Sequence, residues 1–116
     1  MTARVKDPIA FADFERVDIR VGTVLCAESM EKSRSLVRLT VDFGDHQRKI
    51  LAGLKQERQD LSKLEGLQTL FVVNLEPRQM MGEESQGMLC DIGYADGLTP
   101  VFALLENPVP NGTRVG

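Results

Sequence analysis

Two alternating stretches, VDIRVGTVLCA at residues 17–27 and LVRLTVDF at residues 36–43, decide the fold that we expect. In the first stretch, one set of alternate positions is mostly apolar and the other is mixed: Val17, Ile19, Val21, Thr23 and Leu25 against Asp18, Arg20, Gly22 and Val24. A period of two is typical of a β-strand with one buried face. The stretch therefore predicts a half-buried strand, and Gly22 inside it suggests a bend where a barrel curves.

The second stretch predicts one arm of a β-hairpin. Its two faces carry Val37, Leu39, Val41 and Phe43 on one side and Leu36, Arg38, Thr40 and Asp42 on the other. Gly44-Asp45 is a turn signal, and residues 46–51 return as the paired strand. His46 stands beside this turn, so we expect an exposed histidine that binds no metal.

Further strands are expected at residues 69–74, 88–92 and 101–105, where β-branched and other apolar residues gather. With a helix inserted before the fourth strand, five or six short strands favour an all-β fold. The OB-fold, a small closed Greek-key β-barrel with one short inserted helix, is the best match. A β-sandwich is the alternative, and the position of the helix favours the barrel.

Two helical segments are expected. Residues 56–64 predict a helix of about two turns, with Gly66 after it as a C-cap. Residues 9–15 predict a helical turn that leads into the barrel, with Asp7 as its cap and Pro8 at its first position.

The bulk composition fits a single globular domain over residues 1–116. The chain is 42% hydrophobic and 27% charged, and no apolar run approaches the roughly 20 residues that span a bilayer. The start, MTARVKDPIAF, lacks the apolar stretch of a signal peptide. We therefore expect a cytoplasmic protein with no membrane partner.

No feature of the sequence predicts catalysis, a metal or a cofactor. The motifs GxSxG, HExxH, GxGxxG and the P-loop are absent, and there is one histidine. Cys26 and Cys90 are far apart and form no CxxC pair, which argues against zinc. Two buried, reduced thiols are the preferred interpretation, with a disulfide as the alternative.

The charge is polarised along the chain although the formal net charge is −3. Residues 32–58 hold three acidic and seven basic side chains, the latter being Lys32, Arg34, Arg38, Arg48, Lys49, Lys55 and Arg58. Residues 82–116 hold five acidic side chains and one basic one. This distribution indicates either a nucleic-acid-binding region or an ordinary solvated surface.

The densest polar segment is NLEPRQMMGEESQGML at residues 74–89. It holds side chains that can hydrogen-bond to bases or phosphates, and methionines against which a base can pack: Arg78, Gln79, Ser85 and Gln86, with Met80, Met81 and Met88. The alternative is a long surface loop whose methionines plug the end of the barrel.

This segment resembles the signature of the tRNA-binding domain family, which occurs in methionyl-tRNA synthetases and as free-standing proteins. FERVDIRVGTV at residues 14–24 and VPNGTRV at residues 109–115 are also similar to family patterns. The resemblance implies an OB-fold with a C-terminal extension, a homodimer built through it, and binding to the outer corner of tRNA. It implies RNA contact by residues at the motif positions, which are Asn74, Arg78, Ser85 and Met88, with Gln86 beside them.

Two positions depart from the family pattern. Ser35 and Gln79 stand where many relatives have lysine, and Lys32, Arg34 or Arg38 can supply the charge at the first of them. The sequence is also similar to the CsaA secretion-chaperone branch of the family. That likeness implies the alternative function, binding of unfolded polypeptide as an export chaperone.

The mechanism that we expect is electrostatic capture of tRNA with release of counterions. Five cations would carry it, namely Arg34, Arg38, Lys49, Lys55 and Arg78. Unstacked bases would then pack near Met88 and hydrogen-bond to Ser85 or Gln86. The expected partners are tRNA, a second copy of the chain, and an aminoacyl-tRNA synthetase or an unfolded polypeptide.

Overall fold

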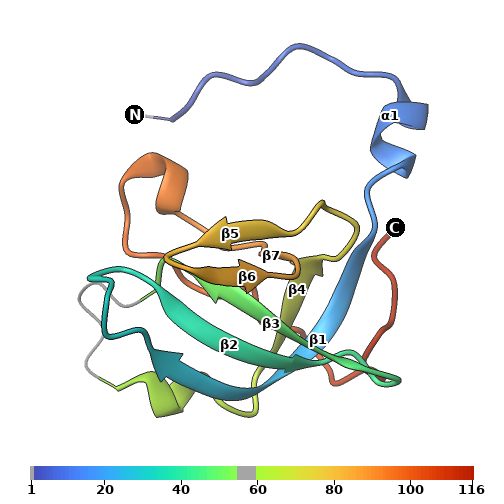
Figure 1. Cartoon of the computed structure of the whole chain (residues 1–116). Helices are drawn as coiled ribbons and strands as arrows, with labels where there is room; N and C mark the ends of the chain where they lie inside the picture. The colour runs from blue at the N-terminus through green and yellow to red at the C-terminus, as the bar shows by residue number, and fades with distance from the viewer. Residues whose placement is uncertain (1, 55–59) are drawn as a thin grey trace.

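The structure is a computed structural model that describes residues 2–54 and 60–116. These residues form a curled, five-stranded antiparallel sheet and a separate two-stranded sheet (Figure 1). The large sheet has the order β3-β2-β1-β4-β7, from β1 (Ile19–Ser29), β2 (Val37–Asp42), β3 (Gln47–Ala52), β4 (Gln68–Val72) and β7 (Met88–Leu89). The small sheet pairs β5 (Arg78–Met80) with β6 (Glu83–Ser85).

β1 joins the two halves of the large sheet. Its first half pairs with β4, its second half pairs with β2, and the register shifts between Val24 and Cys26. Val24 fills the core, whereas Leu25 is 43% exposed. The face that we expected to be apolar, which included Leu25, is therefore not the face that packs in the core.

Gly22 allows β1 to lie close to the adjacent strand. A Cβ atom at this position would stand 2.5 Å from Cγ1 of Val41 and 2.9 Å from Cε1 of Phe43. Contacts this short would force the two strands apart. The glycine is therefore explained by this close packing on the inner face of the curled sheet.

The predicted hairpin is confirmed. Val37, Leu39, Val41 and Phe43 are all buried, and the amide of Phe43 donates to the carbonyl of His46 at 2.9 Å. Gly44 takes the left-handed conformation that the turn needs, with φ of 100°. The core that this hairpin covers also contains Ile50 and Phe71, which stacks edge-on against Phe43.

Three local predictions were wrong. α1 covers only Phe11–Glu15, and its N-cap is Ala10 without a side-chain bond, so Asp7 does not cap it. Residues 101–105 form no strand and only one isolated bridge, from Val101 to Ile92. The strand expected at residues 88–92 covers only Met88–Leu89, and the segment before it, for which a long surface loop was the alternative, contains the β5–β6 hairpin.

The inserted helix is a single 3-10 turn where the structure describes it. η1 covers Leu61–Leu64, and the Asp60 carboxylate caps it by accepting from the amide of Ser62 at 3.0 Å. The predicted residues 56–59 lie outside the described part. A second 3-10 turn, η2, covers Tyr94–Asp96.

The C-terminal segment lies along the outer side of β1. The amide of Gly112 donates to Val21 O at 2.8 Å, and that of Val115 donates to Ile19 O at 2.9 Å. This segment covers Val21, which is buried although it does not belong to the main core cluster. The described residues include no helix long and apolar enough to cross a bilayer.

Candidate nucleic-acid interface

Side-chain and backbone groups of residues 85–87 join β3 to the β6–β7 connection. The Ser85 hydroxyl accepts from the Leu51 amide and donates to the Gly87 carbonyl, both at 3.0 Å. The Gln86 side-chain oxygen accepts from the Lys49 amide, and the Gln86 amide donates to the Lys49 carbonyl, both at 2.9 Å. We call this contact, residues 85–87 against residues 49–51, the seam. It spans the gap between β3 and β7, where no regular strand ladder is formed among the described residues, so the barrel is not strictly closed.

Asn74, another residue of the signature, ties two chain segments together. Its Oδ1 accepts from the amide of Asp18 at 2.7 Å, and its Nδ2 donates to the carbonyl of Arg16 at 2.6 Å. Asn74 follows β4, so these bonds fix the chain between α1 and β1 against the end of that strand. Ser85, Gln86 and Asn74 therefore have structural partners already, and their contact with RNA stays a prediction.

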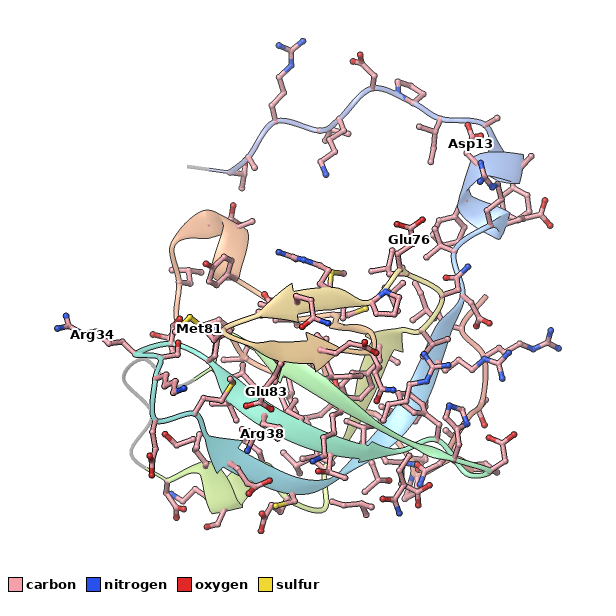
Figure 2. The ribbon with its side chains drawn as sticks, in the orientation of Figure 1. Asp13, Arg34, Arg38, Glu76, Met81 and Glu83 are labelled. Atoms are coloured by element: carbon pink, nitrogen blue, oxygen red, sulfur yellow. The ribbon has the colours of Figure 1, made fainter. Side chains whose placement is uncertain are left out.

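Arg38 binds acidic side chains instead of standing free. It lies on β2, donates from Nε to Oε1 of Glu83 at 2.7 Å and from Nη2 to the other carboxylate oxygen, and has Glu28 at 3.8 Å (Figure 2). This hydrogen bond is the main reason that the pKa of Glu83 lies below its ordinary value. The pair fixes the β5–β6 hairpin on the outer face of β2.

The other predicted contacts do not form one continuous patch. Lys49, Arg78, Gln79 and Met88 are exposed close to the seam, since Lys49 bonds to Gln86 and Arg78 pairs with Ser85 across β5 and β6. Arg34 extends into solvent from the loop before β2, away from the β5–β6 hairpin (Figure 2). Lys55 lies outside the described residues.

A small pocket at the end of the barrel was not expected from the sequence. It has a volume of about 230 Å³ and is lined by Asp18, Arg20, Phe43, His46, Arg48, Val73 and Asn74. We call it the barrel-end pocket. Its residues come from β1, the β2–β3 turn, β3 and the end of β4, which the curled sheet brings together.

Arg48 is the most constrained cation of the barrel-end pocket. Its Nη1 donates to the carbonyls of Val73 at 2.6 Å and Gln86 at 3.1 Å, and its Nε donates to Nε2 of His46 at 2.9 Å. The guanidinium carbon lies 5.8 Å from the centre of the Phe43 ring, on which His46 also stacks. Because a guanidinium only donates, Nε2 of His46 acts as the acceptor in this contact, and Nδ1 of the same ring lies 2.6 Å from Oδ1 of Asp45.

Arg20 and Asp18 form the opposite wall of this pocket. Nε and Nη2 of Arg20 donate to the two carboxylate oxygens of Asp18 at 2.9 and 3.0 Å. This bidentate bond is the main reason that the pKa of Asp18 is lowered, and the positive charges of Arg114 and Arg48 lower it further. Several guanidinium groups thus act on a single carboxylate.

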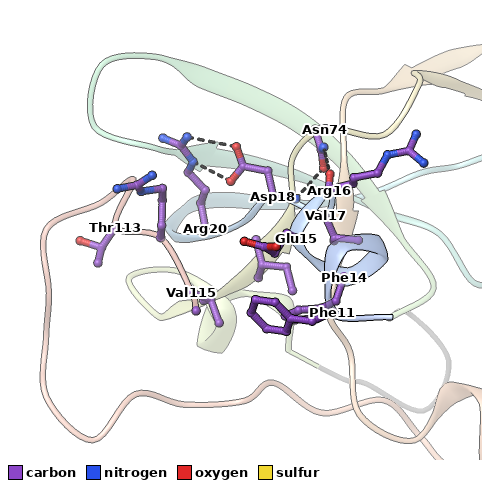
Figure 3. Close-up of a pocket in the computed structure, with 13 residues that line it drawn as sticks. Phe11, Phe14, Glu15, Arg16, Val17, Asp18, Arg20, Asn74, Thr113 and Val115 are labelled. Atoms are coloured by element: carbon purple, nitrogen blue, oxygen red, sulfur yellow. Dashed lines mark hydrogen bonds and ion pairs between the residues drawn. The ribbon is translucent and has the colours of Figure 1, made fainter. Parts of the chain in front are cut away.

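A larger, partly apolar groove adjoins this pocket and shares Asp18, Arg20 and Asn74 with it (Figure 3). We call it the arm groove; its volume is about 720 Å³ and it lies between α1 and the C-terminal residues 113–116. Phe11 and Phe14 of α1 line it and are 72% and 45% exposed. No residue of α1 is buried, so this helix has little packing of its own.

The described residues offer no cluster of three or more His, Cys, Asp or Glu that could hold a metal. Cys26 and Cys90 are free thiols, as expected, but each is half-buried and not fully buried. Burial is the main cause that raises the pKa of both. His46 is exposed as predicted, and it bonds to Asp45 and Arg48.

Residues 19–114 match the family described as "Putative tRNA binding domain". The chain belongs to this tRNA-binding domain family. It is 41% identical to a methionine–tRNA ligase of Archaeoglobus fulgidus over 113 residues, which are 95% of this chain and 16% of that protein. It is 45% identical to the enzyme of Natronomonas pharaonis over 108 residues, 92% of this chain and 15% of the enzyme. The chain thus spans about a sixth of the length of these relatives.

Solved structures of the family have the same fold. A protein from Pyrococcus horikoshii related to methionyl-tRNA synthetase superimposes with a TM-score of 0.86 at 34% identity, covering 96% of this chain and all of that one. The chaperone CsaA of Bacillus anthracis superimposes with a TM-score of 0.84 at 28% identity, covering 95% of this chain and all of that one. The predicted OB-type, mostly-β fold is therefore confirmed, and both predicted branches of the family are among the relatives.

Sequence reasoning missed Arg20, Phe43 and His46 as site residues and counted Arg48 only as part of a basic stretch. Arg20 and Arg48 lie on different strands that do not pair with each other.

Proposed function

We propose that this chain, as one module over residues 1–116, binds tRNA without covalent chemistry. The observation that carries the proposal is the family match over residues 19–114. The relatives are methionine–tRNA ligases, which supports tRNA as the ligand. A cytoplasmic location, where tRNA is used, belongs to the same proposal.

The surface beside the seam is the first contact region that we propose. Lys49 and Arg78 supply positive charge there, while Gln79 and Met88 supply a polar group and an exposed thioether. Cations attract phosphates over several ångströms, and methionine offers a soft surface to an unstacked base. Arg34 and Lys55 remain outlying candidates, and Arg38 would have to leave Glu83 to bind a phosphate.

A salt titration of tRNA binding tests the proposal. The dissociation constant for tRNA should rise steeply with salt, with a log–log slope of about 0.7–0.9 for each phosphate that the protein neutralises. The variant Arg78→Gln should lower this slope, whereas Lys63→Gln, which removes a charge from η1, should not. Absence of tRNA binding at low salt would refute the proposed function.

We further propose that the module recognises the outer corner of the L-shaped tRNA. Two tRNAs with different anticodons should then bind equally well. A fragment that retains the corner should compete with intact tRNA, and an isolated anticodon stem-loop should not. Strong competition by the stem-loop would place the contact elsewhere on the tRNA.

Two protein partners complete the proposal. A second copy of the chain fits the apolar side chains of α1, because Phe11 and Phe14 are both exposed and no residue of the helix is buried. An aminoacyl-tRNA synthetase is the other partner, because the relatives carry a similar segment within methionine–tRNA ligases.

Binding of unfolded polypeptide is the second candidate function. The specific observation in its favour is the arm groove, where exposed phenylalanines line a hollow large enough for side chains of a peptide. The likeness to CsaA supports it as well. Competition between tRNA and a denatured protein separates the two functions. If the first candidate is right, the chain should keep tRNA bound when the denatured protein is added.

A further inference from the structure

The geometry points to the barrel-end pocket as a binding site for a single phosphate of the RNA backbone, held between Arg48 and Arg20. The inference rests on the proposed function and assigns one subsite to it. Neither arginine belongs to the contact residues that the sequence signature implies.

The donors that remain available define the ligand. Nη2 of Arg48 and Nη1 of Arg20 have no hydrogen-bond partner among the described residues, although the other nitrogens of both groups are bonded. The Asn74 side chain already accepts from the Asp18 amide and donates to the Arg16 carbonyl, and the Nε2 atom of His46 accepts from Arg48. The pocket therefore offers guanidinium N–H donors and few free acceptors, which suits an oxyanion.

The floor of the pocket argues against a base. Phe43 is buried, and its ring is covered by His46 at 5.6 Å between centroids and by Arg48 at 5.8 Å. No open aromatic face remains on Phe43 for stacking. A compact group such as a phosphate fits the volume of about 230 Å³ without displacing either side chain.

Preorganisation favours binding at this place. Arg48 is fixed by three acceptors and Arg20 by a bidentate carboxylate, so little side-chain entropy is lost when an anion binds. The pocket opens into the arm groove, whose rim adds Arg16 and Arg114. Together the two hollows are lined by four arginines and only two acidic side chains, Glu15 and Asp18, although the chain as a whole is anionic.

Matched charge variants test the inference in the full chain. Arg20→Gln removes one of the two donors, and Asp18→Asn removes the competing carboxylate. Lys63→Gln is the control, since it removes the same charge from η1, which does not line the pocket. The melting temperature of each variant is measured as well, to check that the fold is kept.

We expect Arg20→Gln to weaken tRNA binding by about tenfold or more, the value of a hydrogen bond to a charged group, and to lower the salt slope by about 0.7–0.9. Asp18→Asn should tighten binding, which loss of a merely structural contact would not do. Lys63→Gln should behave like the wild type.

Two results would overturn the inference while leaving the proposed function intact. One is wild-type tRNA binding with no difference between Arg20→Gln and Lys63→Gln in affinity or slope. The other is a loss of binding to a denatured polypeptide in Arg20→Gln without a change in the tRNA slope, which would assign the pocket to a peptide carboxylate. If the wild type binds no tRNA, the proposed function itself fails.

Discussion

The seam and α1 lie at different places in the molecule and invert the usual roles of polar and apolar side chains. In the seam, the polar Ser85 is 3% exposed and its hydroxyl has two partners. In α1, the apolar Phe11 is 72% exposed and no residue of the helix is buried. The comparison shows that polar residues of a family signature can stabilise the fold, whereas apolar residues at the surface are available to bind partners.

The largest loss of stability should come from breaking the seam with Ser85→Ala. The Leu51 amide would stay buried without its acceptor, which costs about 1–3 kcal/mol in the free energy of unfolding. Urea denaturation, monitored by circular dichroism, measures this loss in the free energy of unfolding. The link between β3 and the β6–β7 connection, and not a ligand contact alone, would then explain why serine stands here.

Ser29→Ala is the control for this prediction. Ser29 is an exposed strand residue, so the change should stay within about 0.5 kcal/mol. An equal effect of both substitutions would mean that the seam hydrogen bonds do not hold β3 to the β6–β7 connection.

A smaller effect should follow from Glu83→Gln, which removes the charge that binds Arg38 beside the seam. Arg38 holds the pKa of Glu83 below its ordinary value of 4.5, chiefly by hydrogen bonding. A lowered pKa in the folded state stabilises the protein above the ordinary pKa, and this contribution is lost as the pH falls through the lowered value. The melting temperature of the variant should therefore be lower than that of the wild type at pH 7, and the gap should narrow in acid.

Glu84→Gln tests whether this pH dependence belongs to the ion pair. Glu84 is the exposed neighbour and has no ion pair among the described residues. The melting temperature of Glu84→Gln should equal that of the wild type both at pH 7 and in acid. A gap for Glu83→Gln that persists unchanged in acid would contradict the role of the Arg38–Glu83 pair.

The hairpin was readable from the sequence because alternation is a local signal. Val37, Leu39, Val41 and Phe43 face the core as their spacing predicts. The same rule failed for β1, because Gly22 and Val24 face the core and Leu25 lies on the opposite face, and a register shift between Val24 and Cys26 then interrupts the alternation. A bulge depends on the partner strands and leaves little trace in the strand that carries it.

The candidate site was harder to predict, because its parts meet only in three dimensions. Arg38 was chosen for its charge, and nothing near it in the sequence indicated that Glu83, 45 residues away, would bind it. Arg20 and Arg48 come together through the curl of the sheet, with the end of β4 between them. Charge counts along the chain therefore located a basic region, but they did not show which cations remain available to bind a ligand.

The smallest effect on stability, and the largest on association, is expected for the double variant Phe11→Ser/Phe14→Ser in α1. Both rings are exposed, so the free energy of unfolding of the single chain should change by less than about 0.5 kcal/mol. If a second copy covers them, each ring contributes about 1.5–3 kcal/mol to association, and sedimentation at micromolar concentration should show monomers. Leu104→Ser is the matched comparison, since Leu104 is 65% exposed in the C-terminal extension, through which the family resemblance implies a homodimer. Should Leu104→Ser dissociate the protein while the α1 variant sediments like the wild type, the copies associate through that segment, and the exposed rings of α1 serve another partner.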